Sequence, residues 1–430
     1  MPQSDAAATA RESRSQLAAK VPLGEDELEF GHAGNTQRWP CKVSLNTEPR
    51  LQLVFEVATQ VPTISLDPTV SVRLLKAGCS CEVFVTSAPR GDETQITLTP
   101  AQEPLTVGGS SQLTEVLFDL VNFPEFFGLT AQGSETVRNR LEIIMAHWRL
   151  QLEPATTREE TSAFRSPLYQ VTHAARLTRT DGAVFDSNEA SDVLDLFHAA
   201  SSFAAGRRTT PVLVRGIEAN GQSTWREWGT RSVDPNLATI DTWFDRYHGQ
   251  ALADFIPGAY RLWKDTAWKD TIRCAIDWYV RAAGLAAAPG SGLILLQAAL
   301  QLLSWQTVVQ HRRSLSAEGF QGLSAADQIR LLMEPCQIPT GLPPGLKRLK
   351  LAAEEQKRNG LDGPEAIARM RSRLVHPSPA EELPVADGFQ LAAWYVELAL
   401  LKLFGFNGKY SNRTRGYQRA GSLEPVPWSH

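Results

Sequence analysis

The hydrophobic pattern of this chain changes its period near residue 240, and this change constrains the fold more than any other feature. Before it, short runs rich in β-branched and aromatic residues alternate with Pro and Gly, which is typical of strands and turns. After it, apolar residues recur at helical spacing, as between Trp268 and Tyr279. The sequence therefore predicts an α+β protein, with a β-rich N-terminal module followed by an all-α helical bundle.

Several short runs in the first half suit strands, and one suits a helix. Asn220-Gly221, a common hairpin turn pair, predicts a hairpin of residues 212–217 and 223–228. Residues 190–204 carry apolar side chains on one helical face. The other expected strands are residues 51–57, 70–75, 81–86, 95–98, 115–120, 141–152 and 172–177.

The second half should contain one very apolar helix among amphipathic ones. Residues 293–309 are apolar on nearly every face, and no Asp, Glu, Lys or Arg occurs in residues 291–311. Four glutamines in that stretch argue against a membrane span and for a buried helix of a soluble bundle. Ser324, Asp362 and Asp387 are expected to begin further helices, and Gly405 to end the last one.

The length and composition bound the organisation of the chain. At 430 residues it is long for one domain. We divide it into a disordered tail (1–40), a β-rich sensing or regulatory module (41–240), a helical bundle (241–415) and a C-terminal tail (416–430). The net charge of −4 excludes a chain whose whole surface coats nucleic acid, but it leaves room for a local basic site. Five cysteines are too few for a disulfide scaffold, which favours the reducing cytoplasm.

The segment from Arg371 to Pro377 is the most informative for function. Asp362 and Pro377 bracket one helix, and a residue before proline disfavours the α region, so His376 should lie at its C-terminal end. Arg371 is five residues earlier, about 140° around the helix. One helix cannot easily direct both side chains at one atom, but two copies packed about a twofold axis would bring their Arg and His residues into one cleft.

An arginine and a histidine in one cleft suit the cleavage of RNA without a metal. Arginine supplies a permanent cation for a phosphate, and histidine moves a proton near neutral pH. The alternative interpretation is that the spacing arises by chance and that His376 only caps its helix.

The same segment resembles the Arg-x4–6-His signature of HEPN domains, which are small helical bundles that dimerise and often cut RNA. Residues 362–367 resemble the approach to that helix, and residues 394–413 resemble the following helix with its Gly-x-Tyr-x-Asn-Arg end. In the first half, residues 120–128, 202–206 and 225–228 are similar to pieces of the β-rich domain of ApeA-like anti-phage proteins. The resemblance spans most of residues 45–415.

This resemblance implies a catalytic pair, Arg371 and His376, in a site shared across a homodimer or higher oligomer. Ser372 stands where the family usually has Asn, and Ser372 and Arg373 would support the pair by orienting the phosphate or the partner histidine. No cofactor or metal is implied. The biological setting would be abortive infection, with a phage-derived trigger sensed by the first half. The alternative is a non-catalytic HEPN scaffold that binds a nucleic acid or a protein.

A basic stretch near the C-terminus is a candidate contact for single-stranded RNA, because cations interleave with aromatic rings there. An alternative for Arg413, as for Tyr410, is packing against the bundle, and for Tyr410 and Arg413 this structural role is the favoured one. The RNA-binding candidates are Lys409, Arg413, Arg415, Tyr417 and Arg419.

Overall fold

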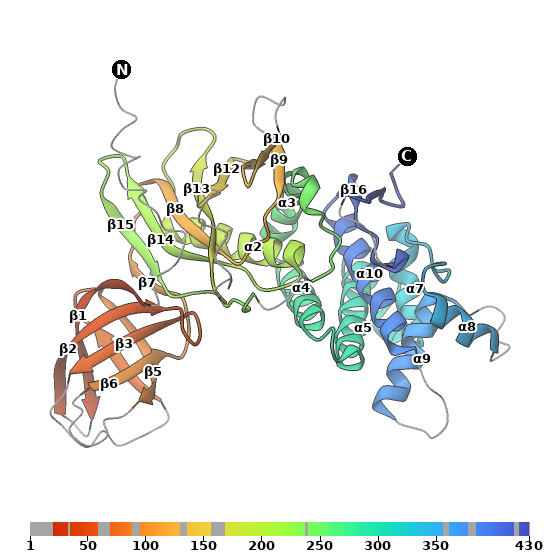
Figure 1. Ribbon diagram of the computed structural model, residues 1–430, viewed down its shortest axis with the longest axis horizontal. Coiled ribbons are helices and arrows are strands. Elements are labelled where there is room, and N and C mark those ends of the chain that lie inside the picture. Colours follow the sequence, from red (N-terminus) through yellow and green to blue (C-terminus); the bar gives the residue numbers. More distant parts are fainter. Residues whose placement is uncertain are drawn as a thin grey trace. The chain divides into compact units, whose positions relative to one another are not determined.

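The structure is a computed structural model. It describes residues 20–32, 35–58, 69–87, 95–129, 136–155, 168–236, 240–355, 361–376, 384–416 and 421–429. The chain forms two compact units. The first comprises residues 1–123, 147–198 and 209–238, and the second comprises residues 124–146, 199–208 and 239–430. The α+β class is confirmed, because β-structure dominates the described N-terminal part and helices dominate the C-terminal part (Figure 1).

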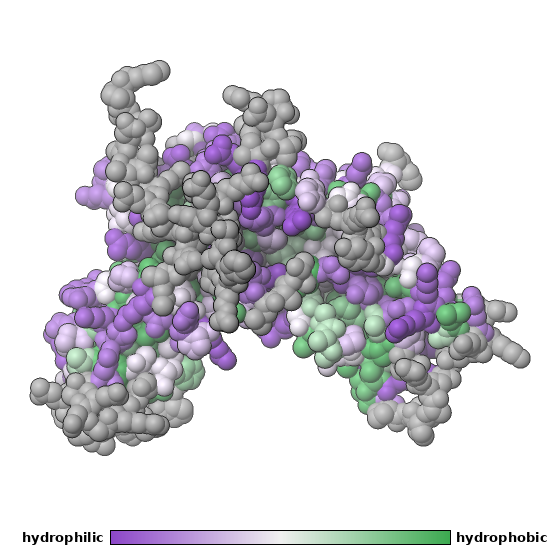
Figure 2. All heavy atoms as spheres, viewed as in Figure 1, coloured by the Kyte–Doolittle hydropathy of each residue, from purple (hydrophilic) through white to green (hydrophobic). Residues whose placement is uncertain are grey.

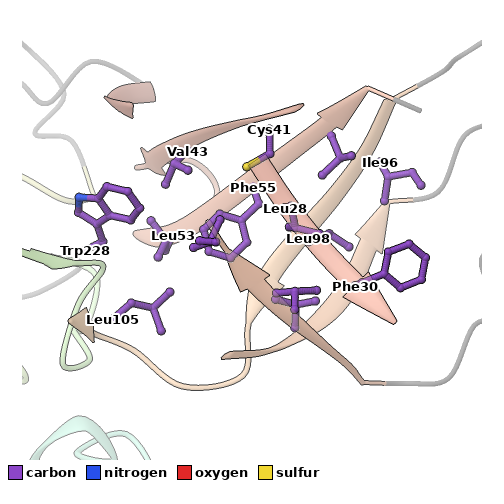
Figure 3. Packing of buried hydrophobic residues seen from close by; sticks show 14 residues of the cluster. Leu28, Phe30, Cys41, Val43, Leu53, Phe55, Ile96, Leu98, Leu105 and Trp228 are labelled. Atoms are coloured by element: carbon purple, nitrogen blue, oxygen red, sulfur yellow. The ribbon is translucent and has the colours of Figure 1, made fainter. Parts of the chain in front are cut away.

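A closed β-barrel opens the first unit, with strand order β1-β2-β3-β6-β5-β4 (Figure 1). Alternating side chains fill its interior, and Figure 3 shows Leu28, Phe55 and Leu98 meeting there. Cys79 and Cys81 pack against this core as partly buried free thiols. The barrel strands are β1 (Lys20–His32), β2 (Asn35–Asn46), β3 (Gln52–Ala58), β4 (Val70–Leu74), β5 (Cys79–Ser87) and β6 (Gln95–Pro100).

An antiparallel sheet follows in the same unit, with its strands in the order β12-β13-β8-β14-β15-β7. Helix α2 (Ser187–Ala205) packs on it, and Phe197 meets Phe118 of β8 with 5.9 Å between ring centroids. The expected hairpin is confirmed, with Gly221 in the left-handed region at φ 80°. The sheet strands are β7 (Leu105–Gly108), β8 (Leu113–Val121), β12 (Trp148–Pro154), β13 (Val171–Arg179), β14 (Thr210–Glu218) and β15 (Ser223–Trp228).

Two expectations for the first half need correction. Residues 1–40 were expected to be disordered, but β1 and β2 occupy the described positions from Lys20 onward, and residues 1–19 lie outside the described part. The alternation of apolar and polar residues in β1 identifies it as a strand, with Leu28 and Phe30 buried. The single strand expected over residues 141–152 is two, β11 (Leu141–Met145) and β12, because Ala146 turns the chain at φ 51°.

The second unit is built mainly of helices, with short strands from the inserted segment 124–146. Phe203 lies among the rings of Trp243, Phe255, Tyr279 and Phe404 at centroid distances of 5.3–6.1 Å. The short strands are β9 (Phe127–Leu129), β10 (Thr136–Arg138), β11, β16 (Lys409–Tyr410) and β17 (Glu424–Pro425). The α-helices are α3 (Gln250–Lys264), α4 (Lys269–Gly284), α5 (Pro289–Trp305), α6 (Ala317–Gln321), α7 (Ala325–Cys336), α8 (Lys347–Glu355), α9 (Gly363–Val375) and α10 (Val385–Leu403). Shorter helical turns are η2 (Arg246–His248), η3 (Gln306–His311) and η4 (Arg413–Arg415).

The most apolar helix is a core helix, as expected. Residues Pro289–His311, comprising α5 and η3, are long and apolar enough to cross a membrane by length and composition. However, 61% of the most apolar stretch is buried inside the protein, which is typical of a core helix in a soluble protein.

The start of α10 differs from the expectation. Asp387 was expected to cap this helix, which instead begins at Val385, so Asp387 lies in its first turn. The Asp387 carboxylate accepts a hydrogen bond of 3.0 Å from the backbone N–H of Leu349 in α8. The aspartate therefore stabilises the start of a different helix, a contact that sequence spacing does not reveal. Gly405 follows the end of α10 at φ 73°, as expected of a C-terminal glycine.

Candidate functional site

Helix α9, which carries the Arg371–His376 segment, has a firmly held N-terminus. The Asp362 carboxylate accepts a hydrogen bond of 3.0 Å from the backbone N–H of Glu365, which confirms Asp362 as the N-cap. The guanidinium of Arg330 in α7 binds both Asp362 oxygens, at 2.7 and 2.9 Å. One carboxylate thus caps α9 and connects it to α7.

Three glycines let α9 lie close to its neighbours. A Cβ on Gly363 would lie 2.1 Å from the Tyr395 hydroxyl, and one on Gly388 would lie 2.4 Å from Met370 Cε. A Cβ on Gly290, at the start of α5, would lie 3.2 Å from Leu374 Cδ2. A Cβ on Gly363 would overlap the Tyr395 ring of α10, so this glycine marks the tightest approach of α9 to a neighbour, while Met370 and Leu374 bring α9 into close contact near Gly388 and Gly290.

His376 lies at the end of this helix and is exposed to solvent. It is the C-cap residue of α9, and its backbone N–H donates a hydrogen bond of 2.8 Å to the Ser372 carbonyl. The expected position at the helix terminus is confirmed. Ser372 is exposed as well, whereas Arg371 and Arg373 are half-buried. The helix end therefore presents an exposed imidazole, while the two arginine side chains are more buried.

Apolar side chains lie exposed at two nearby turns of the same unit. Val375 is 41% exposed directly before His376, and Leu285 is 36% exposed in the turn before α5. A Cβ on Gly290 would lie 3.2 Å from Leu374 Cδ2, so the first turn of α5 lies close to the end of α9. Figure 2 shows hydrophobic residues over this end of the helical part. Val375 therefore exposes apolar surface directly beside His376.

The expected RNA-binding residues at the C-terminus have different surroundings. Lys409 is exposed, and Arg415 is exposed and forms an ion pair with Glu424. Arg413, in contrast, has a side chain only 3% exposed, so it is not accessible to RNA in this structure, and the alternative structural role fits it. Tyr417 and Arg419 lie outside the described residues.

Arg413 belongs to a buried polar cluster with Glu397 of α10 and Tyr279 of α4. The Tyr279 hydroxyl donates to Glu397 Oε1 at 2.5 Å, and Arg413 Nη2 donates to the backbone carbonyl of Asp241 at 2.5 Å. Burial and the Glu397 charge both hold the pKa of Tyr279 well above its usual range, so the phenol is a neutral donor. This cluster fastens the C-terminal segment to the bundle.

Sequence reasoning found Arg413 but not its partner. Glu397 is the charged residue in the otherwise apolar stretch 391–401 of α10, and it is fully buried. A lone acid in an apolar helix is the signal that could have predicted a buried ion pair.

The aromatic and amide side chains after Gly405 are structural too. Tyr410 is buried, and its hydroxyl accepts from Trp394 Nε1 at 3.0 Å and donates to Glu424 at 2.9 Å. Asn412 donates to the same Glu424 oxygen at 2.7 Å. These contacts, with the pairing of β16 and β17, pack much of the C-terminal segment against the bundle.

Metal coordination and thiol chemistry depend on clustered ligands and on ionised cysteines. Within the described ranges, no group of three or more His, Cys, Asp or Glu residues could hold a metal ion. Burial raises the pKa of the Cys41 thiol to about 11 and that of Cys81 to about 12, so both are neutral near pH 7. The charged and titratable side chains in the described last turn of α9 are Arg371, Arg373 and His376.

Comparison with known proteins identifies two domain types. Residues 108–238 match the YopA central domain, and residues 265–424 match the YopA C-terminal domain, which includes α9 and α10. The chain is 25% identical over 337 residues to the SPbeta prophage-derived uncharacterized protein YopA of Bacillus subtilis (strain 168). That match covers 75% of this chain and 74% of the relative. No solved structure matches the chain.

Proposed function

We propose that the protein is an endoribonuclease of the HEPN type that acts in the cytoplasm in anti-phage defence by abortive infection. The observation that carries the proposal is the position of His376, exposed at the end of a helix held at three close approaches, with Arg371 on the same helix. A general acid or base must reach its substrate, and a rigid support keeps it in place.

The proposed reaction needs only the residues at this helix end and the RNA itself. His376 of one copy removes the proton from a ribose 2′-OH, and the oxygen attacks the adjacent phosphorus. The bond to the 5′-oxygen breaks, and a protonated histidine returns the proton to that oxygen. Arg371 binds the phosphate and stabilises the charge that develops on it. The products are a 2′,3′-cyclic phosphate and a free 5′-hydroxyl.

A homodimer or higher oligomer is part of the proposal. Arg371 and His376 are five residues apart, so a single α9 directs them to different sides. The exposed Val375 provides apolar surface beside His376, and Leu285 adds an exposed apolar side chain in the same unit, which a second copy would cover. Two α9 ends would then share one cleft.

The setting in phage defence rests on resemblance and on the relative. The B. subtilis relative is described as prophage-derived, which associates that relative with a phage genome. The β-rich first half would sense a phage-derived trigger and release the nuclease.

The test compares the wild type with His376→Ala and Arg371→Ala. Each protein is incubated with tRNA and total RNA in EDTA, and RNA is also taken from phage-infected cells that express each protein, so that the trigger is present. We expect cleavage with cyclic phosphate ends for the wild type and none for the two variants. Arg369→Ala is the matched control, since Arg369 is exposed on the same helix and pairs with Glu365. Equal cleavage by the wild type and His376→Ala would refute the mechanism.

The alternative is a non-catalytic HEPN scaffold, which the exposed apolar Val375 and Leu285 favour because such surface binds partners. Under this alternative the wild type cuts no RNA in infected cells, and Val375→Asp disrupts its assembly with a partner while His376→Ala does not.

A further inference from the structure

A pocket of about 250 Å³ lies in the first unit, where the start of β1 faces the β14–β15 hairpin. Its walls are largely apolar: Val21, Pro22 and Leu23 from β1 lie opposite Leu213 and Trp228. This pocket lies far along the sequence from the α9 residues and belongs to the other compact unit. It is thus distinct from the proposed nuclease site.

Two arginines line the same pocket, one on each strand of the hairpin. Arg215 of β14 and Arg226 of β15 are direct cross-strand partners, and both are exposed. Side chains directly opposite in an antiparallel pair have Cβ atoms only ~4.5–5.5 Å apart, and like charges there destabilise the sheet. The hairpin therefore holds two positive charges close together at a cost in stability.

No carboxylate neutralises this arginine pair within the described part of the chain. Arg226 Nε reaches Ser223 Oγ at 3.5 Å, and neither guanidinium forms an ion pair with a described residue. Glu227 lines the pocket, but its carboxylate is bound by Arg231, at 2.7 and 3.0 Å, and by the Ser191 hydroxyl at 2.6 Å. Its side chain is 1% exposed, so it does not act as the counter-ion.

The backbone around the pocket is held in an unusual conformation. Leu213 has φ 54°, in the left-handed region that a bulky residue seldom adopts, and the pairing of β14 with β8 shifts between Val212 and Arg215. A bulge of this kind redirects the side chains that follow it, and bulges are frequent beside binding sites. The bulge comes directly before Arg215.

The other side of the pocket is anchored to the barrel. Trp228 packs with Leu105 and Leu53 at the end of the barrel core (Figure 3). The half-buried Glu103 carboxylate accepts hydrogen bonds from the backbone N–H groups of Leu53, at 2.9 Å, and Thr230, at 2.7 Å. These contacts fix the hairpin against the barrel, so the pocket walls keep their positions without a ligand.

We propose that this pocket binds a phosphate monoester that carries a compact apolar or aromatic group, the class to which nucleoside monophosphates belong. The paired guanidinium groups of Arg215 and Arg226 bind the phosphate, and the apolar walls hold the organic group.

Charge and geometry select this ligand class. A phosphate monoester carries about −1.5 to −2 charge near pH 7, which matches two guanidinium groups, whereas a carboxylate supplies only one negative charge. Guanidinium groups bind phosphate through two parallel hydrogen bonds each. The pocket is slightly smaller than the ~300–1,000 Å³ of typical ligand sites, which fits one small molecule.

The experiment measures binding to the full chain by titration calorimetry at low salt. The probes are adenosine 5′-monophosphate and phenyl phosphate, with adenosine and inorganic phosphate for comparison. We expect at least one of the two esters to bind about ten-fold more tightly than either comparison compound. Arg215→Gln and Arg226→Gln should each weaken that binding about ten-fold or more, the effect of losing a charged hydrogen-bond pair.

A matched control and a second measurement distinguish binding from folding. Arg73→Gln removes an exposed strand arginine in the same unit and should leave binding unchanged. Without ligand, Arg226→Gln should unfold at the same temperature as the wild type or higher, because a like-charge repulsion is removed. The proposal is overturned if neither ester binds, if inorganic phosphate binds as tightly as both esters, or if the variants at Arg215 and Arg226 bind like the wild type.

Discussion

The Arg413 guanidinium meets the Glu397 carboxylate through two hydrogen bonds, Nη2 to Oε1 at 2.7 Å and Nε to Oε2 at 3.1 Å. Both side chains are buried, at 3% and 0% exposure. Burial alone lowers the pKa of Arg413, but the adjacent carboxylate outweighs it, so this pKa is raised and the arginine stays charged.

Removing one partner of this pair should destabilise the second unit strongly. Arg413→Met leaves the Glu397 carboxylate buried without its cation, which costs about 3–5 kcal/mol in the free energy of unfolding. Urea denaturation followed by circular dichroism measures this loss. Arg273→Met is the control, because Arg273 and Asp270 form an exposed pair and little change is expected. A loss under ~1 kcal/mol for Arg413→Met would contradict the inferred role.

Gly258 tests the packing of α3 on the chain after α10. A Cβ at this position would lie 1.6 Å from the Phe404 carbonyl oxygen, so Gly258→Ala must displace α3. We expect a loss of about 1–3 kcal/mol, as for overpacked cores. Gly284→Ala is the matched control at the end of α4, where nothing lies within 4 Å, and it should be neutral or stabilising. Equal stability of the two variants would refute the close approach.

His173 of β13 should make the first unit sensitive to acid. The ring is fully buried against Phe123, and burial lowers its pKa to about 3. In the unfolded chain its pKa is about 6.5, so protons bind the unfolded state more readily between these values. The stability contribution is complete above about pH 6.5 and is lost as the pH falls toward 3.

His173→Phe should remove this part of the acid sensitivity. Between about pH 7 and pH 5 the wild type should lose about 2 kcal/mol more stability than the variant. Urea unfolding curves at the two pH values measure the difference. Parallel losses in both proteins would show that His173 is not the group that titrates.

The shared cleft can be tested by mixing two inactive variants. If two α9 ends pool their residues, a heterodimer of Arg371→Ala and His376→Ala still contains one Arg371 and one His376. Mixing under conditions that exchange subunits should then restore part of the RNA cleavage that each variant lacks alone. Mixing Arg371→Ala with itself is the control. Failure to restore activity, although heterodimers form, would place the whole site within one copy.

Lys409 provides the test of the C-terminal RNA contact. It is exposed beside the buried Tyr410, and its replacement by Ala should weaken RNA binding without unfolding the protein. If Lys409 contacts one phosphate, the slope of log affinity against log salt should fall by about 0.7. Filter binding at several salt concentrations measures it, with Arg273→Ala as the control. An unchanged slope would remove Lys409 from the RNA-binding residues.

The fold class and many elements could be predicted because they depend on local pattern. The period change near residue 240, the Asn220-Gly221 turn and the Ser324 cap all carry a short-range signal, and each is confirmed. The strands β1 and β2 were missed because charged residues and an Ala-rich approach resemble a disordered tail. Their order comes from closure of the barrel, which depends on partners distant in sequence.

In the candidate site, too, features with a short-range signal could be predicted, and contacts between distant residues could not. The helix-terminal position of His376 follows from a cap and a proline, and sequence alone could place it. For Arg413 the sequence favoured a structural role over RNA binding, but it could not identify the partners, which are the Glu397 carboxylate and the backbone carbonyl of Asp241, 172 residues away. The arginine pair of the β-hairpin required the register of two strands, which a sequence does not state.

The chain passes between its two units several times, so neither unit is encoded by one continuous stretch of the gene. Phe203, from the segment 199–208, lies at the centre of the aromatic cluster of the second unit. A gene fragment that begins at residue 240 would encode the helices without this ring and without the strands of residues 124–146. A single recombination event near residue 240 would therefore not transfer a complete helical unit. We expect the two units to be inherited together.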